Sequence, residues 1–309
     1  MIANRIAYGE TLIELARERS DILILDVDAC KSTGTLPVLQ QVPDRFIQCG
    51  IAEQNMMGIA AGLAMAGKVP FVATFAVFTC MRAVEQVRNV VCYANVNVKI
   101  AGTHAGLETG GDGGTHQATE DIAIMRSLAN MKVVVPASPN ATRKLTRVIA
   151  ETEGPCYIRM GKDPQPELYG SEEAFPLGGS KVLRDGRDVT LVACGNMVWR
   201  ALEAAKMLKE HGVSARVLDL YSIKPLDQEA LIQAATQTGG LVSIEDHNIY
   251  GGLGGAVAEV LTEHAPARLI RMGLQDVYGR SGNPDQLYEM FHLTPEDIVR
   301  TTLAHFPKS

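Results

Sequence analysis

The sequence predicts an α/β protein built from two doubly wound domains, each with a mostly parallel sheet between helices. Short apolar runs of strand length recur along the 309 residues, and stretches with helical periodicity separate them, which is typical of buried parallel sheets. Residues 161–180 are rich in proline and glycine and lack apolar periodicity, as expected near a linker. We therefore predict domains at 1–165 and 181–309, joined by a linker at 166–180.

In the first domain, apolar runs predict strands, and the segments between them predict helices. A small-residue segment at 59–67 predicts a closely packed helix, and Pro139 followed by Asn140 predicts a helix start. The expected strands are 22–27, 70–75, 97–102, 132–137 and 156–160.

The same alternation predicts the second domain. Its expected strands are 188–194, 213–220, 241–246 and 268–272, and its helices are 198–211, 227–237, one after Gly255 and two at the C-terminus. Thr294, followed by proline and two acids, predicts the cap of the last helix. Gly252–Gly255 follows a strand, but it lacks the full spacing of a dinucleotide fingerprint; we interpret it as a tight turn.

Composition excludes several classes of protein. The 29 basic and 35 acidic residues give a net charge of −6, which argues against nucleic-acid or anionic-membrane partners. No stretch approaches the ~18 apolar residues of a membrane span, and the charged N-terminus is unlike a signal peptide. The six cysteines form no C-x-x-C pair, so zinc and redox sites are not expected. We expect a cytoplasmic location.

The most unusual segment is a glycine-rich loop at 102–123, which contains His104, Asp112 and His116. It follows a predicted strand, so it lies at the carboxyl end of the sheet, where open α/β sheets bind ligands. Long loops in compact domains are usually functional; the other interpretation is a solvated surface loop. Gly111–Gly113 with Asn140 superficially matches a metal–diphosphate motif, but Asn140 is too far along the chain. We predict no metal site in this chain.

Three segments at 45–67, 71–89 and 103–117, in this order and spacing, resemble the pyrimidine-binding domain of transketolases. Residues 222–227 and 245–261 resemble the transketolase C-terminal domain. The resemblance covers essentially the whole chain. It implies the C-terminal subunit of a split transketolase, which uses thiamine diphosphate. The Mg²⁺ and the cofactor's diphosphate would then be held by an N-terminal subunit, and the expected assembly is a heterotetramer with two copies of each chain.

The resemblance also implies cofactor-binding residues. Glu53 would hydrogen-bond N1′ of the aminopyrimidine and so assist formation of the reactive carbanion; from the sequence alone it reads equally as a helix-capping acid. Phe75 and Phe78 would flank the ring, although spacing alone favours core residues. Met81 stands where some relatives have a third aromatic residue, and methionine can still pack against a ring.

For the sugar, the resemblance implies that His104, Asp112 and His116 face its hydroxyls, with both histidines able to move protons. Gly111 replaces an acid that many relatives carry. Arg5, Ser32 and Arg159 would hold the terminal phosphate, because guanidinium groups pair with phosphate oxygens. Taken singly, surface arginines and loop serines are common. Arg159 is more informative than Arg5, because it ends an apolar strand, where an unpaired arginine would be costly to bury.

The implied reaction is transfer of a two-carbon ketol unit from a ketose phosphate to an aldose phosphate. One alternative is the β subunit of a 2-oxoacid dehydrogenase E1 component, and another is a non-catalytic binding protein. The residues leave the sugars open between ordinary pentose phosphates, a specialised phosphosugar and a sulfosugar. Residues 58–67 and 71–92 are the expected contact with other subunits.

Overall fold

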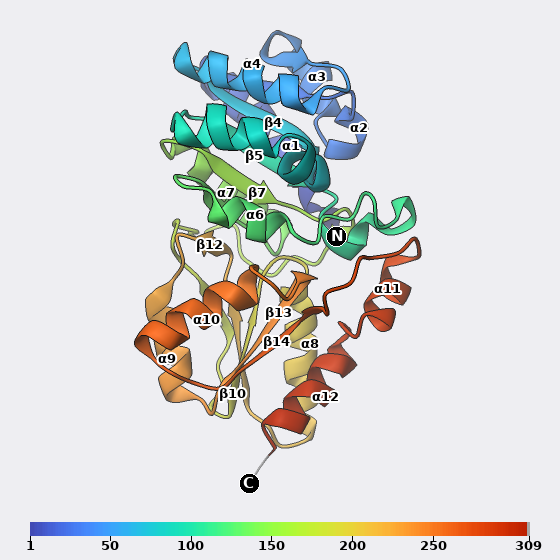
Figure 1. The fold of residues 1–309 in the computed structure, drawn as a ribbon, viewed down its shortest axis with the longest axis vertical. Helices are drawn as coiled ribbons and strands as arrows, with labels where there is room; N and C mark the ends of the chain where they lie inside the picture. The colour runs from blue at the N-terminus through green and yellow to red at the C-terminus, as the bar shows by residue number, and fades with distance from the viewer. Residues whose placement is uncertain (308–309) are drawn as a thin grey trace.

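Two sheets organise the chain in the computed structural model, which describes residues 1–307. The N-terminal half surrounds a seven-stranded sheet, and the C-terminal half surrounds a five-stranded sheet (Figure 1). The predicted α/β class with two mainly parallel sheets is confirmed. Residues 308 and 309, the last of the predicted second domain, lie outside the described range. No helix within 1–307 is long and apolar enough to cross a membrane.

The larger sheet has the order β12-β6-β7-β5-β4-β2-β3. Its strands are β2 (Ile22–Asp26), β3 (Phe46–Gln48), β4 (Val69–Phe75), β5 (Lys99–Thr103), β6 (Lys132–Val134), β7 (Cys156–Arg159) and β12 (Ser222–Lys224). All neighbours pair in parallel except β12, which is antiparallel to β6. The five strands predicted for this domain are all present. The central strands β5 and β7 are buried along their whole length, which is why they read as continuous apolar runs.

Helices cover both faces of this sheet. They are α1 (Asn4–Glu18), α2 (Cys30–Thr33), α3 (Leu36–Gln41), α4 (Glu53–Met65), α5 (Val84–Gln86), α6 (Asp121–Ser127) and α7 (Pro139–Glu151), with η1 (Pro43–Arg45), η2 (Phe78–Arg82), η3 (Val87–Tyr93) and η4 (Gly106–Asp112). α1 and α7 share one core cluster, whereas α4, η2 and η3 contribute to the other. Ser138 caps α7 by accepting from the amide of Ala141, so Asn140 belongs to the first turn of a helix, as predicted.

The smaller sheet has the order β14-β13-β10-β11-β9. Its elements are β9 (Lys181–Arg184), β10 (Val189–Ala193), β11 (Ala215–Asp219), β13 (Leu241–Asn248), β14 (Leu269–Leu274), α8 (Met197–Glu210), α9 (Gln228–Gln237), α10 (Leu253–His264), α11 (Pro284–Met290) and α12 (Pro295–His305). Thr294 caps α12 in a capping box with Asp297. Helix α10 begins at Leu253, earlier than predicted, because the Glu245 carboxylate accepts from the amides of Leu253 and Gly254. The turn interpretation of Gly252–Gly255 agrees with this geometry.

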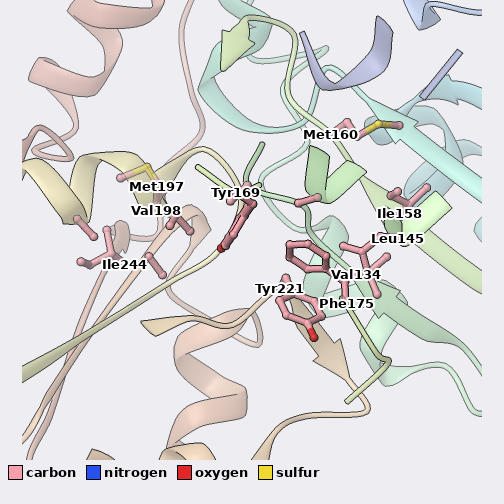
Figure 2. Close-up of a cluster of buried hydrophobic side chains, with 14 of the residues drawn as sticks. Val134, Leu145, Ile158, Met160, Tyr169, Phe175, Met197, Val198, Tyr221 and Ile244 are labelled. Carbon is pink, nitrogen blue, oxygen red and sulfur yellow. The ribbon is translucent and has the colours of Figure 1, made fainter. Parts of the chain in front are cut away.

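The two halves are joined by more than the connecting chain. Strand β12 comes after the predicted linker in sequence but extends the sheet of the first half. Beside it, Tyr169, Phe175 and Tyr221 stack edge to face in a buried cluster shown in Figure 2. A two-stranded ribbon also pairs β1 (Ile2–Ala3) with β8 (Pro164–Gln165). The division at 165 and 181 stays a prediction, with an edge strand and aromatic side chains crossing it.

Candidate active site

The carboxyl ends of β4, β5 and β7 meet at one edge of the larger sheet, because these strands are parallel neighbours. The segments that leave this edge contain most of the predicted site residues. Phe75 ends β4, and His104 follows β5 directly. The same edge therefore collects side chains from η2, η4 and the start of α4, as expected for a ligand site in an open α/β sheet.

Glu53 is the first residue of α4 and is only 3% exposed. Its Oε1 accepts a hydrogen bond of 2.9 Å from Nη1 of Arg82, whose side chain is 49% exposed. The Arg82 guanidinium also lies over the Phe78 ring, 4.2 Å from its centroid. A buried acid at the rim of the sheet, with one half-exposed partner, can exchange that partner for a hydrogen bond to a bound ring.

Four rings gather at this edge of the sheet, and Arg82 connects them to Glu53, because its guanidinium bonds Glu53 and lies over Phe78. Phe75 and Phe78 are nearly parallel, with centroids 5.8 Å apart. The imidazole of His104 stacks on Phe75 at 3.9 Å, and His116 points edge-on toward Phe78 at 5.5 Å. Met81, in the same η2 segment, is 40% exposed. The structure therefore brings together residues that were predicted separately for the cofactor and for the sugar, and the flat apolar surface suits an aminopyrimidine.

His104 adopts a left-handed backbone conformation, with φ of 53°, and is buried. Its Nδ1 lies 3.1 Å from Thr103 Oγ1. Burial lowers the pKa of His104 to about 3, and the charges of Arg5 and Lys162 act in the same direction. The imidazole is thus neutral near pH 7 and can donate one hydrogen bond and accept another.

The loop at 102–123 is largely packed against the protein. Leu107, Thr109 and Gln117 are buried, whereas His116 is half-buried and Asp112 is exposed at the end of η4. His116 Nδ1 lies 2.9 Å from Thr115 Oγ1. The interpretation as a solvated loop therefore does not describe most of it, although Gly111 and Asp112 do face solvent.

Cationic groups lie near His104. Arg5, in the first turn of α1, donates from Nε to the Lys162 carbonyl at 3.2 Å. Lys162 donates from Nζ to Thr109 O at 3.3 Å. Helix α1 also touches the segment that carries half-buried Ser32: a Cβ added to Gly34 would lie 2.2 Å from the Arg5 carbonyl oxygen. Lys162 is a cation that the sequence reasoning missed.

Arg159 occupies a different environment from the one the resemblance implied. It is 4% exposed, and its Nε lies 2.9 and 3.1 Å from the two carboxylate oxygens of Asp121. Its Nη2 donates to the carbonyls of Ala118 and Asp246, at 3.3 and 2.7 Å. The guanidinium is thus committed to protein acceptors. This geometry does not support a contact with the substrate phosphate, and we assign Arg159 to support of the loop.

Within residues 1–307, no group of three or more His, Cys, Asp or Glu side chains could hold a metal ion. Asn140, which superficially completed a metal motif with Gly111–Gly113, donates from Nδ2 to Tyr169 O at 2.9 Å. Its side chain is therefore used in packing α7 against the segment that joins the two halves.

Comparisons with known proteins agree along the whole chain. The model for the transketolase pyrimidine-binding domain matches residues 1–166, and the model for the transketolase C-terminal domain matches 178–298. One subunit of the apulose-4-phosphate transketolase of Phocaeicola vulgatus is 40% identical, over 100% of this chain and 99% of the relative. The 6-deoxy-6-sulfo-D-fructose transketolase subunit SqwH of Clostridium sp. is also 40% identical, over 96% and 92%. A solved split gene transketolase, described as an inactive beta4 tetramer, has a TM-score of 0.91 at 47% identity and covers 99% of this chain and 98% of its own.

Proposed function

Because this chain belongs to the transketolase family, we propose that it is the subunit of a two-chain transketolase that binds the aminopyrimidine end of thiamine diphosphate together with the sugar. It would act in transferring a two-carbon ketol unit from a ketose phosphate to an aldose phosphate. The observation that carries the proposal is buried Glu53, which bonds Arg82, together with the cluster of Phe75, Phe78 and His104 whose Phe78 ring lies under the same arginine. An acid next to a flat apolar surface fits the aminopyrimidine.

When bound, thiamine diphosphate supplies a nucleophilic carbon and an electron sink for cleavage of the bond between two sugar carbons. The residues of this chain would orient that group and the sugar. Glu53 would exchange its bond with Arg82 for a bond to the ring nitrogen. His104 and His116 flank the ring cluster from the substrate loop, defined as residues 104–121, and would share protons with the sugar hydroxyls.

The anionic end of the sugar would be bound by Arg5, Ser32 and Lys162. Arg5 and Lys162 are connected by the hydrogen bond from Arg5 Nε to the Lys162 carbonyl. Both positive charges are close enough to His104 to lower its pKa. They replace the pair of Arg5 and Arg159 that the sequence suggested. A phosphate or a sulfonate would satisfy these cations equally well, which fits relatives named for either kind of sugar.

The anion site can be tested by Lys162→Met, with Lys162→Arg as the matched control. We expect Lys162→Met to raise the KM of a phosphorylated donor about tenfold, since a bond to a charged group contributes about 1.5–3 kcal/mol. The KM of an unphosphorylated ketose should change by less than twofold, and Lys162→Arg should restore most of the loss. An equal loss for both donors would remove Lys162 from the anion site.

A partner subunit would complete the site. The diphosphate end of the cofactor carries most of its charge and requires a metal with oxygen ligands, which we assign to an N-terminal subunit holding Mg²⁺. The surface around α4 and η3 supports a protein contact: Ile51, Met65 and Tyr93 are 76%, 67% and 85% exposed. Gly58 and Gly62 on α4 also face open space. A heterotetramer with two copies of each chain is the proposed assembly.

The proposal is tested by assaying the reconstituted pair of subunits. Turnover of xylulose 5-phosphate with an aldose phosphate is expected, and turnover of a 2-oxoacid instead would favour the dehydrogenase β subunit, which the comparisons do not favour. This chain alone should be inactive and bind the cofactor poorly; the inactive tetramer described for the solved relative is consistent with this expectation. Tight binding of cofactor and Mg²⁺ by the isolated chain, measured by calorimetry, would contradict the assignment of the diphosphate to a second subunit.

A further inference from the structure

The substrate loop at 104–121 is attached to the second half of the chain at several points. The central contact is Asp246 in β13, which is 2% exposed. Its two carboxylate oxygens accept the amide of Leu107 at 3.0 and 3.1 Å. Leu107 lies in the first turn of η4, three residues after His104. A carboxylate from the C-terminal sheet therefore caps the turn that follows the histidine.

The Asp246 carboxylate also accepts hydrogen bonds from two side chains of the C-terminal half. Tyr288 donates its hydroxyl at 2.7 Å and Asn196 donates its amide at 3.2 Å. The fit around the carboxylate is close, since a Cβ added to Gly106 would lie 2.2 Å from Asp246 Oδ2. Gly106 also has a φ of 70°, which favours glycine. The carboxylate thus has a fixed position, and the loop backbone approaches it as closely as a residue without a side chain allows.

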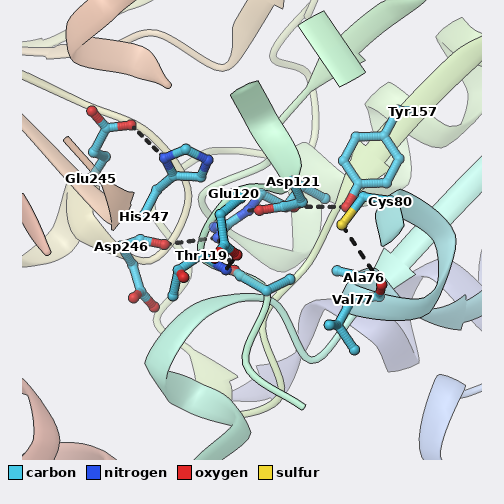
Figure 3. A network of polar contacts seen from close by, with 12 residues as sticks. Ala76, Val77, Cys80, Thr119, Glu120, Asp121, Tyr157, Glu245, Asp246 and His247 are labelled. Atoms are coloured by element: carbon cyan, nitrogen blue, oxygen red, sulfur yellow. Dashed lines mark hydrogen bonds and ion pairs between the residues drawn. The ribbon is translucent and has the colours of Figure 1, made fainter. Parts of the chain in front are cut away.

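Other contacts hold the far end of the loop. The Asn248 amide donates to Thr119 O at 2.7 Å, and Gln117 donates from Nε2 to Arg280 O at 3.0 Å. Arg159 links the two parts, because its Nη2 donates to the Asp246 carbonyl while its Nε pairs with Asp121. Figure 3 shows Asp246 and its neighbours lying against Thr119–Asp121.

We propose that Asp246 is a positioning residue for sugar recognition: by capping η4, it sets where His104 and His116 stand against the substrate. This inference rests on the proposed function. It gives the C-terminal domain a part in the reaction, although it provides none of the residues assigned to the cofactor or to the sugar. The effect is local, because Thr109 Oγ1 donates to the His104 carbonyl and so closes the turn onto the histidine.

Asp246→Asn tests the inference with almost no change of shape. The amide presents one acceptor oxygen where the carboxylate presents two, so Leu107, Asn196 and Tyr288 lose acceptors. Asp219→Asn is the matched control: Asp219 is also a fully buried carboxylate of the C-terminal sheet, but it accepts from Tyr169 and does not touch the loop. Both variants should lose stability, and only Asp246→Asn should disturb the substrate loop.

In the reconstituted complex, we expect Asp246→Asn to lower kcat/KM for the donor ketose at least tenfold, mainly through KM. The apparent affinity for thiamine diphosphate should stay within twofold, and Asp219→Asn should leave both constants within twofold. Tyr288→Phe removes one donor to Asp246 and keeps the ring, which lies 3.8 Å from the Arg200 guanidinium. This variant should lower kcat/KM for the donor ketose two- to threefold, again without a change in the affinity for thiamine diphosphate. It provides the test if Asp246→Asn does not fold.

Hydrogen exchange tests the contact without an activity assay. Amides of residues 105–112 should exchange faster in Asp246→Asn than in the parent, and not faster in Asp219→Asn. Unchanged exchange, or a loosened loop with an unchanged donor KM, would overturn the inference. If the parent complex has no ketol-transfer activity, the proposed function fails, and the exchange comparison alone then decides whether Asp246 positions the loop.

Discussion

Two ion pairs at the same end of the larger sheet have the same chemistry and opposite surroundings. Glu53–Arg82 joins a buried acid to an arginine that is half-exposed. Asp121–Arg159 joins two groups that are 0% and 5% exposed, and Tyr157 adds a third bond to the acid. The first pair can open toward a ligand, because its arginine can be hydrated when released. The second cannot open without leaving charge buried in the protein.

The comparison shows that the role of an arginine depends on what else holds it. Within residues 1–307, the Arg82 side chain has one polar contact, with Glu53, and one aromatic contact, with the face of the Phe78 ring. Arg159 makes bonds to Ala118 and Asp121 of the substrate loop and to Asp246 of β13, so it joins two segments that are far apart in the sequence. A ligand can replace a single contact, whereas it cannot replace a network that also holds the fold together.

The largest expected effect comes from Glu53, the acid of the pair that can open toward a ligand. Glu53→Gln should lower kcat of the reconstituted enzyme by about 10²–10⁴-fold, the usual contribution of an acid–base group. The free energy of unfolding should change little, since the amide can still accept from Arg82. Steady-state kinetics and urea unfolding measure the two effects. Retention of more than about a tenth of kcat would contradict the assignment.

Breaking the buried Asp121–Arg159 pair should lower the stability of the chain. Arg159→Met should lower the free energy of unfolding by about 3–5 kcal/mol, because Asp121 is left charged, buried and without its cation. Urea denaturation of the chain measures this. In the double variant Arg159→Met/Asp121→Asn, part of the loss should return. A stable Arg159→Met chain that discriminates only against phosphorylated donors would instead return Arg159 to the anion site.

The smallest effect should come from Arg82, the half-exposed arginine that pairs with Glu53. Arg82→Met should change the free energy of unfolding by less than about 1 kcal/mol, as for partly exposed ion pairs, because Glu53 then remains at the N-terminus of α4. The methionine can still cover the Phe78 ring. The same urea titration gives the contrast with Arg159→Met. A loss as large as that of Arg159→Met would mean that the two pairs do not differ in kind.

Much of this architecture could be predicted from local sequence patterns. The strands β2, β4, β5, β6 and β7 are short apolar runs, and Pro139 marks the start of α7. The long-range partners could not be predicted in this way. Arg159 at the end of an apolar strand reads the same whether it meets a phosphate or Asp121, which is 38 residues away in sequence. Only the fold shows that Lys162, three residues further on, joins Arg5 as a second cation near His104.

The contribution of the second half to the site was also beyond sequence reasoning. Asp246 reaches Leu107 across 139 residues, and no periodicity links two such positions. The start of α10 depends on a side-chain contact of the same kind, in which the Glu245 carboxylate accepts from the amide of Leu253. The sequence does not show this contact, so the helix was predicted to start too late. A buried acid that caps a turn looks like an ordinary strand residue until the backbone that it meets is known.

The pairing of β6 with β12 also has a consequence for synthesis on the ribosome. When residue 134 has been translated, 88 more residues must follow before Ser222 can pair with it (222 − 134). At 5–20 residues per second, this takes about 4–18 s. During this time β6 is an open edge, which can pair with another nascent chain. The growing polypeptide therefore has a period of exposure to aggregation that ends only when the antiparallel strand emerges.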